Sequence, residues 1–393
     1  MQVSVPWRGA HSASRFAFGR ALGASFLALA VLATPAGAAF ETSARQAMLV
    51  DLETGSVLLD KSADERMPTS SMAKIMTIYL LFEALQDGRL SLDDTLPVSE
   101  YAWRKGGSKM FVEVGTEVAV EDLIRGIVVQ SGNDASIVVA EALAGTEEAF
   151  ARRMTDTARS FGMDNTSFTN STGWPDPDHY STARDLALLS ERLIRDFPQY
   201  YHYFSELEFT FSGIKQGTRN PLLYRDIGAD GLKTGHTEDA GYGLAASAAQ
   251  DGRRLLLVVN GLDSVNARAE ESARLLSWGF REFENVTLFQ AEDTIETADV
   301  WMGVAETVPL VLADDLSMTL KRGSRRNLQV TVRVDGPVEA PIAKGDRIGT
   351  LVVAGPEMAP RELPLLAGAA VEEKGFFGRA ATNAGQLLFG WLD

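Results

Sequence analysis

The sequence pattern changes at Glu284, and this change limits the possible folds more than any other feature of the chain. Before it, helix-type and strand-type segments alternate, whereas Val286–Val371 contains short β-prone runs separated by Gly, Pro and Asp turns. Apolar residues make up 45% of the 393 residues and charged residues 23%, so the chain can bury a substantial core. The sequence therefore predicts an α/β domain at 39–284 followed by a small all-β domain at 285–371.

Several segments have the periodicity of a strand or of a helix. The alternation on both sides of Glu53-Thr54-Gly55 predicts a β-hairpin over Gln46–Asp60, and Leu255–Asn260 has the pattern of a buried strand. Helices are predicted at Met72–Leu85, Asp122–Val128, Asp134–Ala144, Ser181–Asp196 and Ala267–Phe283. In the all-β part, strands are predicted at Val308–Leu312, Leu328–Val334 and Ile348–Val353.

Residues 1–38 have the composition of a secretory signal peptide. Arg8, Arg15 and Arg20 lie in a leader without acids, an apolar run covers Ala21–Ala33, and small residues at 36–38 form a cleavage pattern. An N-terminal membrane anchor is the alternative, but the apolar run is too short to span a bilayer comfortably. We therefore expect an exported protein, either periplasmic or peripheral on the outer face of the cytoplasmic membrane.

The last segment, 372–393, is predicted to be an amphipathic helix that anchors the protein to the membrane surface. Its glycines, Gly378, Gly385 and Gly390, each weaken a helix by about 1 kcal/mol relative to alanine. A helix docked on the protein's own core, or one that binds a protein partner, stays open as an alternative. The apolar residues at helical spacing are Phe376, Phe377, Ala380, Ala381, Ala384, Leu387, Leu388, Trp391 and Leu392.

Composition excludes several classes of function. The chain has no cysteine, which excludes disulfides, thiol catalysis, iron–sulfur clusters and cysteine-ligated zinc. Its formal charge of −16 makes sequence-independent nucleic-acid binding improbable, because such binding needs basic surface to neutralise phosphates. No cofactor is predicted, and no metal site either, since ligand patterns such as H-E-x-x-H are absent from the sequence.

The first motif that carries chemistry is Ser71-Met72-Ala73-Lys74, at the start of a helical pattern. Residues three apart share a helix face, so the Ser71 hydroxyl and the Lys74 amine can meet. A desolvated, neutral lysine can activate a serine hydroxyl as a nucleophile. The chain prefers arginine to lysine for positive charge, so a lysine within a motif suggests that proton transfer matters. Alone, the motif is better explained by an N-cap serine and a solvated lysine.

Two further motifs follow in order. Ser131-Gly132-Asn133 lies between two helical patterns, and Lys233-Thr234-Gly235 lies where an edge strand could present lysine and threonine to a carboxylate. Taken singly, each fits an ordinary turn. The set S-x-x-K, S-x-N and K-T-G in this order on an exported chain is the pattern of class A β-lactamases and penicillin-binding proteins.

The chain resembles the low-molecular-mass penicillin-binding proteins of the D-alanyl-D-alanine carboxypeptidase type. The resemblance implies a β-lactamase/transpeptidase-like domain, in which helices flank a sheet and form a helical subdomain, followed by the β-rich domain and the amphipathic helix. It implies cleavage of the terminal D-alanine from peptidoglycan stem pentapeptides, and β-lactams as covalent inhibitors. The matching segments are Pro68–Thr77, Gly106–Phe111, Leu123–Ile127, Gln130–Ala135, Tyr180–Asp185 and Asp230–Tyr242.

The resemblance also implies roles for the matching residues. Ser71 would attack the carbonyl of the penultimate D-alanine, and Lys74 would take its proton. Ser131 would bridge the two lysines and the leaving amine, while Asn133 would bind the substrate backbone. The backbone N–H groups of Ser71 and His236 would form the oxyanion hole.

At the carboxylate end of the substrate, the resemblance implies a set of positive and hydroxyl groups. Lys233 would supply positive potential and help to keep Lys74 neutral, and Thr234 would contact the carboxylate. Arg219 and Arg268 match arginines near the same end. The other histidines of the mature chain, His179 and His202, are expected on the surface.

Three other functions remain open at this point. A β-lactamase would need an extra glutamate for fast deacylation, and 165–180 contains none. A D,D-endopeptidase would use the same residues on cross-linked peptides. A non-catalytic envelope-binding protein could keep the fold, although the intact Ser71, Lys74 and Lys233 argue against it.

Overall fold

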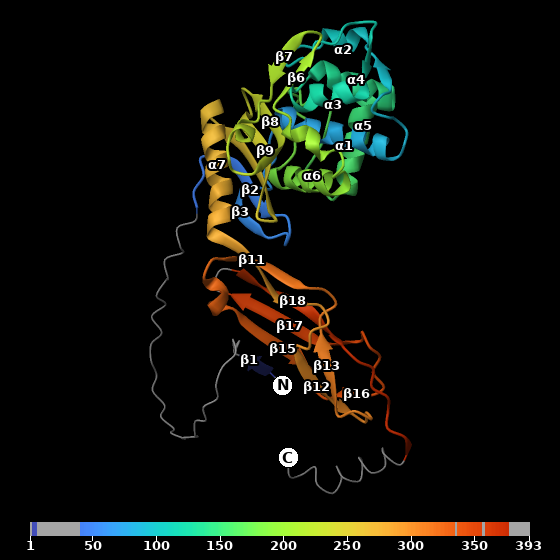
Figure 1. Cartoon of the computed structure of the whole chain (residues 1–393), viewed down its shortest axis with the longest axis vertical. Helices are drawn as coiled ribbons and strands as arrows, with labels where there is room; N and C mark the ends of the chain where they lie inside the picture. The colour runs from blue at the N-terminus through green and yellow to red at the C-terminus, as the bar shows by residue number, and fades with distance from the viewer. Residues whose placement is uncertain (1, 6–39, 335, 356–357, 377–393) are drawn as a thin grey trace. The chain divides into compact units, whose positions relative to one another are not determined.

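The computed structural model describes residues 2–5, 40–334, 336–355 and 358–376, in two compact units (Figure 1). One unit is Gly37–Phe283, and the other contains the chain from Glu284 onward. Apart from a short strand at its start, the predicted signal peptide lies outside the described residues, as does the predicted tail helix beyond Phe376. No helix within the described ranges is both long and apolar enough to cross a bilayer.

A five-stranded sheet forms the centre of the first unit. Every pair of neighbouring strands is antiparallel, and the spatial order is β3-β2-β10-β9-β8, which leaves β8 at an edge. The strands are β2 (Gln46–Asp51), β3 (Val57–Lys61), β8 (Ala229–Thr237), β9 (Gly241–Gln250) and β10 (Arg253–Leu262).

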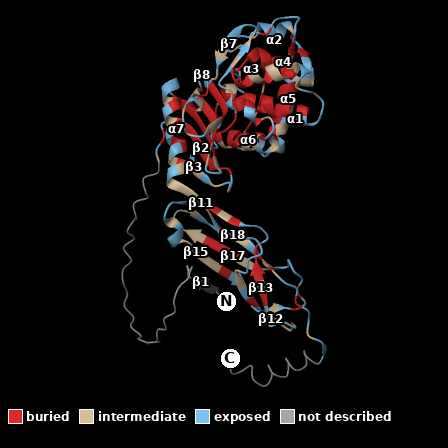
Figure 2. Cartoon of the chain, in the orientation of Figure 1, coloured by how far each residue is buried: buried red, intermediate tan, exposed pale blue. Residues whose placement is uncertain are grey.

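The apolar run in β10 is continuous because both faces of this sheet are covered. Successive side chains of a strand point to opposite faces. Leu257 and Val259 join a core with Leu276 of α7 (Val265–Glu282), whereas Leu256 and Val258 join the larger core with the other helices. Figure 2 shows the resulting band of buried residues through the sheet.

Helix α1 (Lys74–Gln86) lies at the centre of the larger core and is buried on nearly all sides. Such a helix must be apolar around its whole circumference, which explains the run Ile75–Leu85 and leaves Lys74 in an apolar setting. The helices around it are α2 (Glu100–Arg104), α3 (Val120–Val128), α4 (Asn133–Ala144), α5 (Glu147–Ser160) and α6 (Ala183–Asp196).

Short elements complete the first unit. Three 3₁₀ turns are η1 (Ser70–Ala73), η2 (Tyr201–Ser205) and η3 (Pro221–Tyr224). Two small antiparallel pairs are β4 (Thr95–Pro97) with β5 (Glu117–Ala119), and β6 (Glu208–Phe211) with β7 (Ile214–Gly217).

The second unit is built almost entirely of strands around one apolar core. Its larger sheet has the order β1-β15-β17-β18-β13-β12-β16, and β11 pairs with β14 in a separate sheet. Leu316, Met318 and Leu320 alternate along β14 and share a core with Leu351 and Leu365 of the larger sheet. The elements are β1 (Gln2–Val5), β11 (Phe283–Phe289), β12 (Glu296–Trp301), β13 (Thr307–Val311), β14 (Leu316–Lys321), η4 (Ser324–Asn327), β15 (Gln329–Val334), β16 (Val338–Glu339), β17 (Arg347–Gly355) and β18 (Met358–Ala367).

The predicted α/β part followed by a β-rich part is confirmed, as are the hairpin β2–β3, the buried strand β10 and the five predicted helices. Helix α5 is an addition to the prediction. Phe150, Met154 and Ala158 carry its buried face, but they stand among charged residues that dilute the apolar pattern. Strand β8 (Ala229–Thr237) is longer than the motif Lys233-Thr234-Gly235 indicates, because pairing with β9 extends it.

Candidate active site

Three segments that are distant in sequence meet beside the free edge of the sheet. Ser71 lies in η1 and Lys74 begins α1, Ser131 lies in the connection from α3 to α4, and Lys233 lies in β8. Lys74 Nζ is 3.0 Å from Ser71 Oγ, and Lys233 Nζ is 2.9 Å from Ser131 Oγ. The three motifs therefore form one site, as the sequence predicts.

The site opens into a cleft of about 260 Å³. Lys74, Asn133 and Lys233 are buried next to this cleft, so all nine residues predicted for the site gather there. The lining residues are Ser71, Ser108, Ser131, Arg219, Thr234, Gly235, His236, Tyr242, Val265 and Arg268.

Lys74 has no exposed surface and is held by three oxygen atoms. Besides Ser71 Oγ, its Nζ donates to Asn133 Oδ1 at 2.8 Å and to the Thr172 carbonyl at 2.6 Å. Burial first, and the positive charge of Arg219 next, lower the pKa of Lys74 to about 7, against the opposing effects of Asp134 and Glu147. A substantial fraction of this amine is therefore neutral near pH 7 and able to accept a proton.

Lys233 is also buried, and its Nζ donates to Ser131 Oγ and to the Thr234 carbonyl at 3.2 Å. Burial first, and the charges of Lys74, Arg219 and Arg268 next, lower the pKa of Lys233 well below its usual value. The two motif lysines thus repel each other across the site. Ser131 contacts Lys233, while Lys74 donates to Asn133 instead.

The Ser131 connection is held in a strained conformation. Ser131 has φ of 61°, in the left-handed region that a residue with a Cβ seldom adopts. Asp134 has no exposed surface, and its carboxylate accepts hydrogen bonds from the backbone of Met110 and Phe111 at 2.8 Å each. A Cβ at Gly132 would lie 3.1 Å from the Met110 nitrogen, so glycine lets these two segments pack closely.

Strand β8 brings Thr234 and Gly235 to the cleft from the sheet edge. The sequence predicts that Gly235 leaves room for a substrate backbone. A Cβ there would lie 3.0 Å from both the Ser70 Cβ and the Thr69 carbonyl, so the glycine first allows η1 to pack against the strand. The His236 ring packs against the Tyr242 ring at an angle of 30°, with ring centroids 3.9 Å apart.

Two guanidinium groups add positive charge to the cleft. Arg219 donates to Ser108 Oγ, and Arg268 on α7 donates to the Arg219 carbonyl at 3.4 Å. Arg268 is 6% exposed and lies 5.7 Å from the ring centroid of Tyr242. Its Nε is buried and has no hydrogen-bond partner among the described residues.

The segment between α5 and α6 contributes to the site, although the sequence gives no sign of it. The Asn170 carboxamide oxygen accepts hydrogen bonds from the backbone nitrogens of Thr172, Gly173 and Trp174, and this turn fixes the Thr172 carbonyl against Lys74. Buried Glu147 accepts from the Ser171 backbone and hydroxyl. No motif marks these residues, because backbone carbonyls carry no sequence signal.

The prediction that His179 lies on the surface is wrong. His179 is 4% exposed, and burial lowers its pKa to about 4, whereas His202 is exposed as expected. The His179 ring packs edge-on against Phe168 and its Nδ1 accepts from the Thr169 backbone at 3.2 Å. Only the folding of the segment back on itself creates this environment.

Within the described ranges, no group of three or more acidic or histidine side chains could hold a metal ion.

Comparison with protein families gives matches over both units. Residues 32–264 match the model of the D-alanyl-D-alanine carboxypeptidase family, and residues 283–373 match the C-terminal domain of penicillin-binding protein 5. Among curated proteins, the chain is 40% identical over 375 residues to the D-alanyl-D-alanine carboxypeptidase DacC of Escherichia coli (strain K12). That match covers 92% of this chain and 93% of the relative.

Two solved structures are also similar to this chain. Penicillin-binding protein 5 from Haemophilus influenzae superposes with a TM-score of 0.76 at 37% identity, over 85% of this chain and 98% of that one. Penicillin-binding protein D2 from Listeria monocytogenes, in its ampicillin-bound form, gives a TM-score of 0.57 at 30% identity. The second match covers 61% of this chain and 98% of that one.

The contact between Gly173 and Ser70 gives a test of how the nucleophile is positioned. Gly173 has φ of 77°, and a Cβ there would lie 1.8 Å from the Ser70 carbonyl oxygen. Gly173→Ala must therefore displace Ser70 and its neighbour Ser71, and a shift of about 1 Å at a reacting group costs about 100-fold in rate. We expect a loss of that size in the rate of labelling by a fluorescent penicillin.

Gly162→Ala is the matched control for Gly173→Ala. Gly162 has φ of 82°, but no atom lies within 4 Å of a Cβ built there. It carries the same backbone strain of about 1–2 kcal/mol without the clash, so labelling should continue at the normal rate. Equal labelling rates in the two variants would show that Gly173 does not position the nucleophile.

Proposed function

The chain belongs to the D-alanyl-D-alanine carboxypeptidase family, and on that premise we propose that Ser71 is its nucleophile and Lys74 its general base. The protein is thus a serine-type hydrolase of the penicillin-binding class that removes a terminal D-alanine. The observation that carries the assignment is the 3.0 Å contact between Ser71 Oγ and the buried amine of Lys74.

Acylation begins at this contact. Ser71 Oγ attacks the carbonyl carbon of the penultimate D-alanine, and its proton passes to the neutral amine of Lys74. The new charge on the carbonyl oxygen is stabilised by the backbone N–H groups of Ser71 and His236, since both residues line the cleft. The peptide C–N bond then breaks and leaves an ester on Ser71.

Departure of D-alanine requires that its nitrogen gains a proton. The proton taken by Lys74 returns to this nitrogen, with Ser131 as the relay because its hydroxyl lines the cleft and contacts Lys233. Asn133 accepts from Lys74 and donates to the Gly106 carbonyl at 2.8 Å, so it orients the base in addition to the predicted contact with the substrate. Water then attacks the ester carbon and gives its proton to Lys74, and Lys74 passes that proton to Ser71 Oγ as the ester C–O bond breaks.

The free carboxylate of the substrate explains why basic side chains gather at the catalytic cleft of a protein whose net charge is negative. Thr234, Arg219 and Arg268 line the same cleft, and Lys233 lies directly behind it. A carboxylate there gains charge-assisted hydrogen bonds from these groups. This requirement restricts cleavage to the last residue of a peptide, as a carboxypeptidase needs.

The site favours slow release of penicillin over its rapid hydrolysis. Class A β-lactamases use a loop glutamate for deacylation, and 165–180 contains none. Glu147 is buried nearby, but its carboxylate is engaged by Ser171 and by the Tyr101 hydroxyl at 2.6 Å. β-Lactams are therefore covalent inhibitors of this protein.

An endopeptidase would have to accept a cross-linked amine in place of D-alanine, and cleavage of cross-linked dimers measures that activity.

The remaining assignments concern location and rest on sequence pattern. The signal at 1–38 places the mature protein outside the cytoplasmic membrane, where its stem-peptide substrate is found. The peptidase domain at 39–284 and the β-rich domain at 285–371 then precede the anchor helix at 372–393. This helix holds the protein on the outer face of the cytoplasmic membrane through its apolar side chains.

The nucleophile is tested by the site of the penicillin adduct. Mass spectrometry of the labelled protein should find the adduct on Ser71, and Ser71→Ala should abolish both labelling and release of D-alanine. Ser70→Ala is the matched control, because Ser70 is the adjacent hydroxyl and is bonded to Thr237 instead of Lys74. An adduct on any other residue, or labelling that persists in Ser71→Ala, would refute the assignment.

The pKa of Lys74 gives a pH dependence with a definite sign. The base is active when neutral, so the rate of acylation should rise with pH around a midpoint of about 7 and level off above it. One pH unit below the midpoint, the rate should be about a tenth of its plateau. Stopped-flow acylation by a chromogenic β-lactam measures this profile.

Two lysine variants serve as controls for the profile. Lys74→Arg keeps the charge but removes the base, because a guanidinium does not lose its proton, so acylation should be nearly lost at every pH. Lys233→Arg should lose less and keep the rising profile, since its role is mostly electrostatic. Near-normal acylation in Lys74→Arg would exclude Lys74 as the base.

The anchor is tested by truncation. Removal of 375–393 should move the protein from the membrane fraction to the soluble fraction, because burial of Phe, Leu and Trp supplies the attachment. Release of D-alanine from a small peptide in solution should be unchanged. If the truncated protein stays with the membrane, the attachment lies elsewhere in the chain.

A further inference from the structure

Glu147 is a buried carboxylate that none of the steps of acylation uses. It begins α5 and is 5% exposed, whereas Glu148, in the same first turn, is exposed. An acid in the first turn stabilises a helix from an exposed position as well, so the start of α5 does not account for the burial of Glu147. Burying a carboxylate is costly unless hydrogen bonds replace its hydration.

Three hydrogen bonds hold the Glu147 carboxylate. Ser171 donates to Oε1 from its backbone nitrogen at 3.0 Å and from its hydroxyl at 2.7 Å. The Tyr101 hydroxyl, from α2, donates to Oε2 at 2.6 Å. A carboxyl group that only accepts hydrogen bonds is the ionised form, because a protonated acid would have to donate one. Glu147 therefore brings a negative charge below the surface.

The bonds from Ser171 lead directly to the base. Ser171 precedes Thr172, whose carbonyl accepts from Lys74 Nζ at 2.6 Å. The Ser171 carbonyl in turn accepts from the hydroxyl of Thr77 on α1 at 2.7 Å. Glu147 thus holds Ser171 by its donors and Thr77 holds it by its acceptor, so the Thr172 carbonyl is fixed relative to Lys74.

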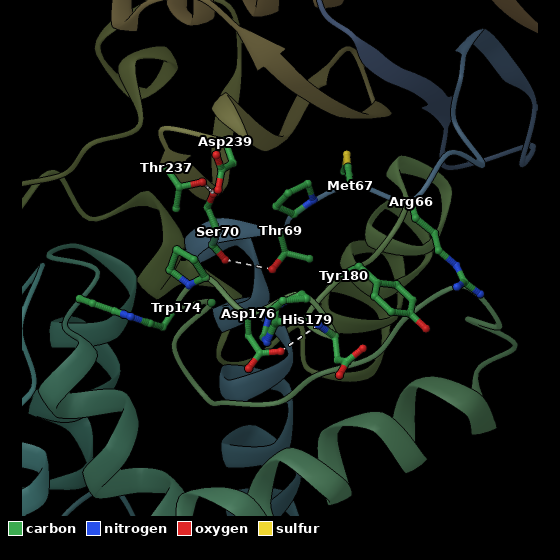
Figure 3. Close-up of a pocket in the computed structure, with 15 residues that line it drawn as sticks. Arg66, Met67, Thr69, Ser70, Trp174, Asp176, His179, Tyr180, Thr237 and Asp239 are labelled. Atoms are coloured by element: carbon green, nitrogen blue, oxygen red, sulfur yellow. Dashed lines mark hydrogen bonds between the residues drawn. The ribbon is translucent and has the colours of Figure 1, made fainter.

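The segment that carries this carbonyl depends on such side-chain contacts. The structure describes residues 168–179 without a helix or a strand. From Gly173 onward, residues of this segment line a second cavity, of about 660 Å³ (Figure 3). Because open space adjoins the segment there, the place of the Thr172 carbonyl depends on the side chains that tie the segment inward, namely Asn170 and Glu147.

Position alone does not explain why one of these two ties is charged. The neutral carboxamide of Asn170 is sufficient to hold the adjacent turn. The charge of Glu147, in contrast, acts on Lys74, together with other groups from the elements packed around it. The titratable and charged groups that interact with Lys74 are Asp134 on α4, Glu147 on α5, Lys233 on β8, and Lys105, His179 and Arg219 in connecting segments.

The reaction needs Lys74 in both of its protonation states. The neutral amine takes the proton of Ser71, and the ammonium must then hold this proton until it returns to the leaving nitrogen. Burial first, and Arg219 next, lower the pKa of Lys74, whereas Asp134 and Glu147 raise it. A group that both accepts and returns a proton works best when its pKa is close to the working pH.

We propose that Glu147 is a positioning residue for the base: through Ser171 it holds the Thr172 carbonyl against Lys74, and its buried charge stabilises the proton that Lys74 carries during acylation. The inference rests on the proposed function, because that function assigns the proton to Lys74. Glu147 is not among the residues that line the catalytic cleft, so it acts through its neighbours and not on the substrate.

Glu147→Gln tests the charge. The amide keeps the shape of the carboxylate, since its oxygen can accept from Ser171 and its nitrogen can donate to the Tyr101 oxygen. Loss of the anion should shift the midpoint of the acylation profile to lower pH, by about half a pH unit. One unit below the wild-type midpoint, acylation should then rise from about a tenth to about a quarter of its plateau. Stopped-flow acylation by a chromogenic β-lactam measures this change.

Glu148→Gln is the matched control for the charge. It removes the same charge from the next residue of α5, where the side chain is exposed and water screens it. The midpoint of its acylation profile should therefore equal that of the wild type. In about 1 M salt, the shift in Glu147→Gln should persist, because salt screens a buried charge only weakly.

Ser171→Ala tests the position of the Thr172 carbonyl. It removes the hydroxyl donor, but keeps the backbone donor and the charge of Glu147. A carbonyl that is held less firmly places Lys74 less accurately, so the plateau rate of acylation should fall about three- to tenfold. The midpoint should stay at its wild-type pH, since no charge is lost.

The outcomes separate this inference from the proposed function. A midpoint that does not fall in Glu147→Gln, an equal fall in Glu148→Gln, or a wild-type plateau in Ser171→Ala would overturn the role of Glu147. The carboxypeptidase assignment would still stand in these cases, provided that penicillin labels Ser71 and the wild-type profile rises with pH. A wild-type profile without this rise would instead refute Lys74 as the base.

Discussion

A lysine without access to water is the feature on which the rest of the site depends. Lys74 begins the central helix α1, inside the larger apolar core, and three oxygen atoms take the place of its hydration. Burying an ammonium is costly unless its hydrogen bonds are replaced, so the neutral form is favoured. The segments that supply these oxygens must therefore be placed accurately, and a base active near neutral pH is the result.

The surrounding structure serves this placement at some cost to its own stability. Ser70 and Ser131 have φ of 49° and 61°, which is unfavourable for residues with a Cβ. Buried Asp134 and Glu147 are satisfied mainly by backbone and hydroxyl donors, so they tie loops to the helices around Lys74. Apolar packing alone would not require so many buried polar groups, whereas a preorganised reaction site does.

Two neighbouring spaces of opposite charge follow from the way the loops meet β8. Arg219 and Arg268 line the catalytic cleft, and Asp176 and Asp178 line the other cavity. Complementary charge of this kind orients a ligand more than it tightens binding, which suits an enzyme that must place one peptide bond correctly.

The sequence by itself determined the local elements and the reactive residues. The period of the apolar positions predicts α1 and β10, and the spacing of Ser71 and Lys74 predicts that they share a helix face. Only the tertiary structure decided what depends on distant segments: the Thr172 carbonyl on Lys74, the burial of His179, and the second cavity. The reason is physical, because desolvation and loop contacts arise only when parts of the chain far apart in sequence exclude water together.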